Sequence, residues 1–203
     1  MKTPARVGIA VLGLAVLGCA FTLGLMVRHG ISARQDPMAI EVLIARQLRH
    51  LAVPGAARDQ RNPVLLTREV LSEARAHFAD HCAQCHGNDG SGQTQIGRSM
   101  YPRAPDMRAA QTQSLSDGEL FYIIKNGVRL TGMPAWGEDT PEDDRQSWHL
   151  VHLIRHLPQI TQQELEEMQG MNPRSPEEIE EERQEELFLE GKETPQTQPS
   201  HHH

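Results

Sequence analysis

The sequence predicts an all-α protein in which one helical domain lies between an N-terminal membrane-spanning helix and an acidic C-terminal tail. Three observations predict it: a long uncharged stretch near the N-terminus, segments whose apolar residues recur at helical spacing, and helix start and stop signals that bracket those segments. The chain of 203 residues has room for one domain with appendages. Aromatic residues make up only 4% of it, too few to fill a large barrel or a stack of sheets.

The distribution of charge argues against nucleic acid as a partner. The formal net charge at pH 7 is −7, whereas a nucleic-acid-binding domain carries a basic stripe. Residues 1–160 contain 17 Lys and Arg against 15 Asp and Glu, and residues 161–203 contain 3 against 12. The negative charge therefore belongs to the tail. A solvated extension and a docking arm for a basic protein surface are both open for that tail.

Near the N-terminus, 21 consecutive residues, Val7–Val27, carry no charge. A helix of that length is about 31 Å long, enough to cross the hydrocarbon core of a bilayer. The stretch predicts an uncleaved membrane anchor within residues 1–30, because a cleaved signal peptide has a shorter apolar region and a small-residue cleavage site. Lipidation of Cys19 stays open as the main alternative, since Val16-Leu17-Gly18-Cys19 resembles a bacterial lipoprotein box.

Residues 31–66 are expected to form a short helix and a linker. Apolar residues recur at helical spacing within Pro37–Leu51, namely at Ile40, Leu43, Ile44 and Leu48, which predicts an amphipathic helix. The pair Pro54-Gly55 follows it as a breaker. Ala56–Leu66 is then expected to be an extended linker.

Three helices and two long loops are predicted for the main domain, residues 67–158. Thr67 is a plausible N-cap for a helix that runs to His81. The capping box Ser116–Glu119 begins a second helix, and Thr140-Pro141 begins a third that Pro158 ends. The loops between them, residues 87–115 and 128–139, are long enough to need a functional reason or to be disordered.

The acidic extension, residues 159–203, is expected to be part helical and part disordered. Capping boxes predict two short surface helices, Gln162–Met168 and Pro176–Leu189. Their apolar side chains offer a means of docking on the core or on a partner: Leu165, Ile179, Leu187, Phe188 and Leu189. Disorder is expected beyond Gly191.

One motif carries recognisable chemistry, Cys82-Ala83-Gln84-Cys85-His86. This spacing is the attachment signature of a c-type haem. Two thiols one turn apart can each add to a haem vinyl group, and the adjacent histidine can reach the iron. A thioredoxin-like redox site would need alternating strands and helices, and a zinc site would need further ligands at a matching spacing. The motif therefore predicts one covalently attached haem c per chain.

Met133 is the best candidate for the sixth iron ligand. It lies between Gly132 and Pro134 in the loop that joins the second and third helices, where a thioether can be presented without helical constraint. Met100 and Met107 are the alternatives. The other histidines of the domain are expected to be surface or packing residues: His77, His81, His149, His152 and His156.

The order of motifs resembles that of the class I monohaem cytochromes c of bacterial respiratory chains. The resemblance covers about Arg68–Pro158 and rests on four runs: Cys82–Gly87, Tyr101–Met107, Gly118–Gly127 and Gly132–Gly137. It implies a small helical bundle around the haem, in which the helix ending at Cys82 crosses the one that begins near Thr140. The anchor, residues 37–66 and the tail lie outside it.

The resemblance also implies roles for individual residues. His86 would be the proximal ligand and Met133 the distal one, and the carbonyl of Pro105 would accept the imidazole N–H of His86. Tyr101, Arg108 and Trp136 would lie close to the haem or its propionates.

These features together predict an electron-transfer protein rather than an enzyme. His/Met ligation closes both axial positions of the iron, so that it exchanges electrons without binding a substrate. The expected place is the periplasmic side of a bacterial inner membrane, with redox proteins or complex subunits as partners. Two alternatives remain: a haem enzyme or gas sensor with a labile sixth ligand, and a periplasmic metal-handling protein.

Overall fold

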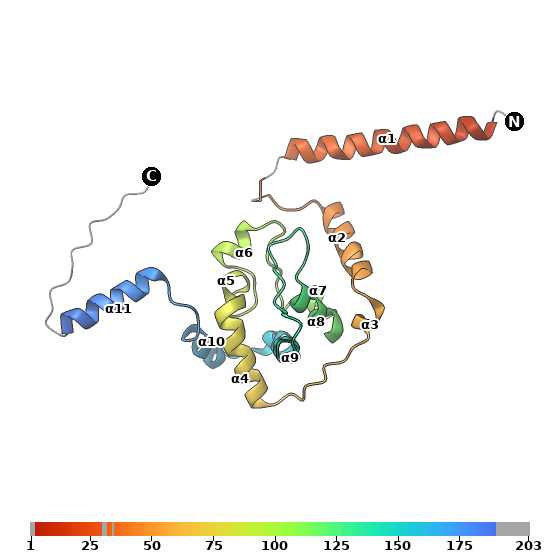
Figure 1. The fold of residues 1–203 in the computed structure, drawn as a ribbon. Coiled ribbons are helices and arrows are strands. Elements are labelled where there is room, and N and C mark those ends of the chain that lie inside the picture. Colours follow the sequence, from red (N-terminus) through yellow and green to blue (C-terminus); the bar gives the residue numbers. More distant parts are fainter. Residues whose placement is uncertain (1–2, 30–31, 34, 190–203) are drawn as a thin grey trace.

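A computed structural model describes residues 3–29, 32–33 and 35–189 of the chain, and every regular element among them is helical. Figure 1 shows a cluster of helices between two outlying ones, α1 and α11. The elements are α1 (Thr3–His29), α2 (Ala39–Ala52), α3 (Gly55–Arg58), α4 (Arg68–His77), α5 (Ala83–His86), α6 (Gln95–Ser99), α7 (Ala110–Gln113), α8 (Asp117–Asn126), α9 (Pro141–His156), α10 (Gln162–Gln169) and α11 (Pro176–Leu189). The predicted all-α class is confirmed.

The N-terminal helix α1 stands apart from the other helices (Figure 1). Its segment Val7–Leu25 is long and apolar enough to cross a membrane, and none of it is buried within the protein. Length and composition are also compatible with a signal sequence. Cys19 is exposed on this helix and carries a free thiol.

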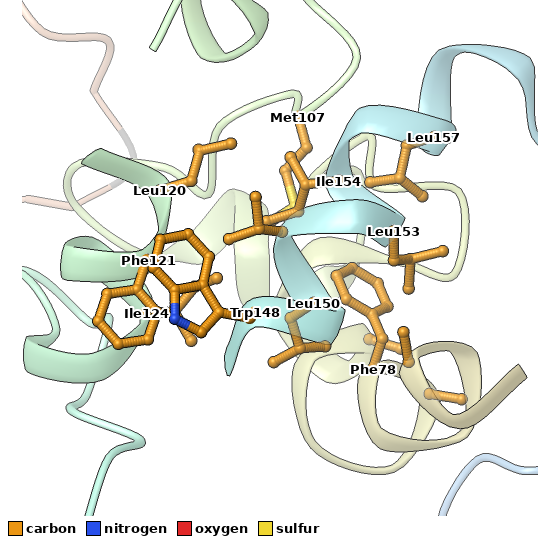
Figure 2. Close-up of a cluster of buried hydrophobic side chains, with 14 of the residues drawn as sticks. Phe78, Met107, Leu120, Phe121, Ile124, Trp148, Leu150, Leu153, Ile154 and Leu157 are labelled. Carbon is orange, nitrogen blue, oxygen red and sulfur yellow. The ribbon is translucent and has the colours of Figure 1, made fainter. Parts of the chain in front are cut away.

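Two helices, α4 and α9, form the centre of the fold. Thr67 caps α4 by accepting from the backbone N–H of Val70, and Thr140 caps α9 by accepting from that of Asp143. The two helices pack together, as the sequence predicted. Figure 2 shows the core between them and α8, where the rings of Phe121 and Trp148 stack with their centroids 4.2 Å apart. Fully buried side chains complete it: Phe78, Val151, Leu153, Leu157 and Met168.

The predicted linker is fixed on the domain. Its first residues form the short helix α3, which packs on α8, where a Cβ at Gly118 would lie 1.9 Å from the carbonyl oxygen of Ala57. The hydroxyl of Ser116 donates to the carbonyl of Arg58 (2.7 Å), and the amide of Asn62 donates to that of Trp148 (2.8 Å). The linker therefore moves with the domain from residue 55 onward.

The two tail helices, α10 and α11, differ in how they pack on the domain. Helix α10 packs on the domain, because Met168 is fully buried and Arg75 of α4 pairs with Glu164 (3.0 Å) and Glu167 (3.3 Å). Helix α11 buries no residue. Its apolar side chains were expected to dock on the core or on a partner, and docking on the core is excluded for Ile179, Phe188 and Leu189, which are exposed. The disorder predicted beyond Gly191 lies outside the described residues.

Candidate haem site

The Cys-X-X-Cys-His motif lies where α4 changes its winding. A π-helical turn, Phe78–Cys82, follows α4 directly, and the four-residue helix α5 carries Cys85 and His86. The turn buries Phe78 and leaves Cys82 half-buried. Both thiols of the motif are free. Burial, reinforced by the neighbouring Cys85, raises the pKa of Cys82 to about 12.

The imidazole of His86 is buried, with 8% of the residue exposed. Burial lowers its pKa, and the backbone carbonyl of Pro105 acts in the opposite direction as a hydrogen-bond acceptor. The Nδ1 atom is buried and makes no hydrogen bond of good geometry within the described part of the chain. Burial thus favours the neutral form of the ring, which is the form in which a histidine binds a metal.

Two glycines let the backbone close around this histidine. A Cβ at Gly92, whose φ is +71°, would lie 2.3 Å from the carbonyl oxygen of Ala104 and 3.2 Å from that of Pro105. A Cβ at Gly97 would lie 2.2 Å from the carbonyl oxygen of Cys85. Any larger residue at these positions would push the Pro105 segment or α6 away from the motif.

The Met133 loop is anchored at the end of α8. Gly127 ends that helix at φ +65°, and a Cβ there would lie 2.6 Å from the carbonyl carbon of Pro134. The backbone N–H of Val128 donates to the carbonyl of Met133 (3.1 Å), and the N–H of Met133 donates to the hydroxyl of Thr131 (3.1 Å). Met133 itself is half-buried.

The segment that contains these residues is similar to a known protein family. Residues 69–154 match the family model described as cytochrome C oxidase, cbb3-type, subunit III. This segment is a class I cytochrome c domain. No curated protein matches the chain significantly. The cofactor of such a domain is a covalently bound haem c with its iron, and its activity is electron transfer.

The residues of the cytochrome domain fit that cofactor. Two free thiols lie one turn apart on the chain, and a buried imidazole follows them directly. Its Nδ1 atom is buried without a hydrogen-bond partner in the described part of the chain, and the Pro105 carbonyl is close enough to raise the pKa of the ring.

The alternative thioether Met100 lies next to the Met133 loop. A Cβ at Gly132 would lie 2.3 Å from the Met100 sulfur, so the two methionines belong to one region of the cytochrome domain. Met107, by contrast, is buried in the hydrophobic core that Figure 2 shows. Proximity alone therefore leaves Met100 as the competitor to Met133.

Three residues expected near the haem have other partners. The hydroxyl of Tyr101 donates to Glu41 of α2 (2.5 Å), and this hydrogen bond is the main cause of a raised pKa for Tyr101. Arg108 makes ion pairs with Asp106 (2.9 Å) and Asp89 (3.1 Å). Trp136 packs on His81, with ring centroids 5.3 Å apart.

The remaining histidines have structural partners, in agreement with their predicted packing roles. His149 is 3% exposed and its Nδ1 lies 3.2 Å from Glu73, beside a groove of about 400 Å³ between α4 and α9. His152 contacts the carbonyl of Val64 (2.8 Å), and His156 contacts Glu164 (2.9 Å). Burial lowers the pKa of both His77 and His149.

Sequence reasoning missed two residues that hold the loop between α5 and α8. The Gln113 amide donates to the carbonyls of Met107 (2.7 Å) and Ile154 (2.8 Å). The Arg155 guanidinium donates to the carbonyls of Gln113 (2.8 Å) and Leu115 (2.5 Å) and to Asp117 (2.8 Å). Only the polarity of Arg155 on an otherwise apolar helix face could have signalled this role.

Proposed function

We propose that this protein is a membrane-tethered cytochrome that passes single electrons through a His/Met-ligated haem c in a bacterial respiratory chain. It acts as a carrier or as a subunit of a larger redox complex on the periplasmic side of the inner membrane. The observation that carries the proposal is the buried His86 imidazole beside the Pro105 carbonyl, directly after two free thiols.

In this proposal each residue of the motif has one task. Cys82 and Cys85 would hold the cofactor by thioether bonds, and the Nε2 atom of His86 would bind the iron. A hydrogen bond from Nδ1 to the Pro105 carbonyl would orient the imidazole and make it a stronger ligand. When bound, haem iron alternates between its ferric and ferrous states and so holds or releases one electron.

Met133 would supply the second protein ligand of the iron, because its loop is tied to the end of α8 by backbone hydrogen bonds. The Val128 to Met133 bond (3.1 Å) closes the loop, and the Gly127 approach to Pro134 fixes where it starts. A thioether ligand raises the reduction potential of the iron and closes the site to small molecules. Such a site favours electron exchange over substrate chemistry.

Two further observations support the proposed membrane anchor and the proposed respiratory complex. Helix α1 supplies a span of sufficient length at Val7–Leu25. The family matched by the cytochrome domain is described as a subunit of a cbb3-type oxidase, which supports an oxidase-type complex as the acceptor or host. For the metal-handling alternative, no group of three or more His, Cys, Asp or Glu suited to a metal occurs among the described residues.

Optical spectra of the oxidised and reduced holoprotein test the ligand assignment. We expect the native chain to be low-spin in both states and Met133→Ala to lose the sulfur–iron band or to become high-spin. Met100→Ala is the matched control, because its thioether lies in the same region, and it should leave the spectra unchanged. Loss of the band in Met100→Ala alone would transfer the role to that residue. A native protein that is already high-spin would favour the haem-enzyme or sensor alternative.

A further inference from the structure

Helix α2 carries an apolar stripe that the rest of the protein leaves uncovered. Five of its side chains are at least half exposed: Ile40 (55%), Leu43 (55%), Ile44 (51%), Leu48 (60%) and Leu51 (75%). At about 100° per residue these five positions lie within one side of the helix. Five exposed large aliphatic side chains on one helix face indicate an interaction surface.

The opposite side of α2 faces the cytochrome domain. Val42 and Arg49 are half-buried, and the same helical spacing puts them on the side away from the stripe, while the half-buried Glu41 lies at its edge. The Glu41 carboxylate accepts from the hydroxyl of Tyr101 (2.5 Å) and from the backbone N–H of Met38 (3.1 Å). The helix thus presents its polar side to the domain and its apolar side outward.

Contacts at both ends fix α2 on the domain. Just before it, Asp36 pairs with Arg103 (3.0 Å) of the loop that holds Pro105. Just after it, Val53 is buried (4% exposed), and the guanidinium of Arg58 donates to its carbonyl (3.1 Å). Because α3 and the linker are also fixed, any flexible joint between anchor and domain must precede α2.

The position of α2 in the chain identifies what covers the stripe. Nine residues separate His29, the last residue of α1, from Ala39, the first of α2. Such a connection spans about 35 Å at most, so the stripe cannot move far from the membrane surface that α1 leaves. The exposed Arg46 lies beside the stripe, where a cation suits anionic lipid headgroups.

We propose that α2 is an interfacial helix that lies on the bilayer surface with Ile40, Leu43, Ile44, Leu48 and Leu51 in lipid, and thereby holds the cytochrome domain at a fixed height above the membrane. The partner is the lipid surface itself. This inference rests on the membrane anchoring in the proposed function. The cytochrome domain is then held at the membrane through the contacts that Tyr101 and Arg103 make with Glu41 and Asp36.

Spin labels on the full-length holoprotein in vesicles of phosphatidylcholine and phosphatidylglycerol test this. On a Cys19→Ser background, single labels are introduced by Leu43→Cys and Leu48→Cys in the stripe and by Arg46→Cys beside it. Leu14→Cys in α1 and Leu65→Cys in the linker, both exposed within the protein (70% and 83%), calibrate lipid and water. The readout is the collision rate of each label with oxygen relative to a water-soluble nickel chelate.

We expect the oxygen preference at positions 43 and 48 to shift toward the value at position 14, and position 46 to stay near the value at position 65. Labels at 43 and 48 that match position 65, with position 14 in lipid, would overturn the inference and leave the anchor intact. Labels that neither reagent reaches would show that a protein surface covers the stripe, which also overturns it. A water-exposed label at position 14 would refute the anchor itself.

A double variant provides a second measurement. Leu43→Gln with Leu48→Gln should abolish the oxygen preference of a label at Ile44→Cys, while the haem spectrum and the label at position 14 stay unchanged. Persistence of the preference would contradict a lipid contact driven by the stripe.

Discussion

The two loops of the cytochrome domain are built differently. The loop on the His86 side, residues 87–109, contains three glycines at positive φ, Gly87, Gly90 and Gly92, and its backbone is tightly hydrogen-bonded, as in the Gly92 N–H to His86 carbonyl bond (2.7 Å). The loop on the Met133 side, residues 128–139, contains two non-glycine residues at positive φ, Leu130 (61°) and Asp139 (58°). Glycines therefore occupy the left-handed positions of the His86 loop, whereas Leu130 occupies such a position in the Met133 loop and is strained there.

This difference indicates that the two sides of the site are held in place in different ways. The His86 side is shaped by the chain before any ligand bond forms, since its glycines permit approaches that no other residue allows. The Met133 side costs free energy to hold in place at Leu130, because leucine disfavours the left-handed region, whereas aspartate, present at position 139, tolerates it. In the proposed holoprotein, a bond from Met133 to iron would offset that cost.

Gly92→Ala, on the His86 side, should have the largest effect on stability. The new Cβ would meet the carbonyl oxygen of Ala104 at 2.3 Å, and a residue other than glycine is strained at φ +71°. We expect the free energy of unfolding to fall by about 3 kcal/mol or more, together with lower haem incorporation. Denaturant unfolding followed at the haem absorption band measures both.

Gly132→Ala is its counterpart on the other loop. There the new Cβ would meet only the end of the flexible Met100 side chain, which can rotate away, so the expected loss is below about 1 kcal/mol. Equal losses in the two variants would mean that the His86 side is no more rigidly built than the Met133 side.

Local signals in the sequence account for most of the helices. Thr67, Ser116, Thr140 and Thr161 each cap a helix as predicted, because a cap depends on residues three positions apart. The one-turn helices α6 and α7 were not predicted, since a single turn is too short to show a period. Tertiary contacts were also out of reach. Nothing local distinguishes Met168, which is fully buried, from the exposed Phe188.

In the candidate site, too, the features local in sequence were predicted and the long-range contacts were not. The adjacency of Cys82, Cys85 and His86 is local and was predicted from spacing. The Tyr101 bond to Glu41 joins residues 60 positions apart, and the Asn62 bond to Trp148 joins residues 86 apart. Such pairs depend on how helices pack, and a single sequence carries no direct signal for that.

The stability of the packing between α4 and α9 can be tested by its dependence on pH. Burial, aided by the nearby Arg145, lowers the pKa of His149, although Glu73 opposes the shift. Below about pH 6.5 the unfolded chain therefore binds a proton at this position that the folded chain does not. Stability should fall as the pH drops from 6.5 through the lowered folded pKa, and His77 should add to the trend.

His149→Gln should flatten this dependence by on the order of 1 kcal/mol between pH 7 and pH 5. Unfolding midpoints at the two pH values measure it. Gln146→Ala is the control, since Gln146 lines the same groove and does not titrate. An unchanged slope in His149→Gln would place the acid sensitivity in the loops rather than in the packing between α4 and α9.

Leu130→Gly is the mildest test, because it removes strain from the Met133 loop without removing a packed side chain. Leu130 has φ 61° and is 93% exposed. Relief of the left-handed conformation is worth about 1–2 kcal/mol, and the greater freedom of glycine in the unfolded chain offsets about 0.5–1 kcal/mol of it. We expect a net gain of about 0.5 kcal/mol with the Met–iron band unchanged. Leu65→Gly, at an equally exposed position without positive φ, should instead lose stability. If both variants lose stability, Leu130 is not strained, and the difference between the two loops lies in their hydrogen bonds alone.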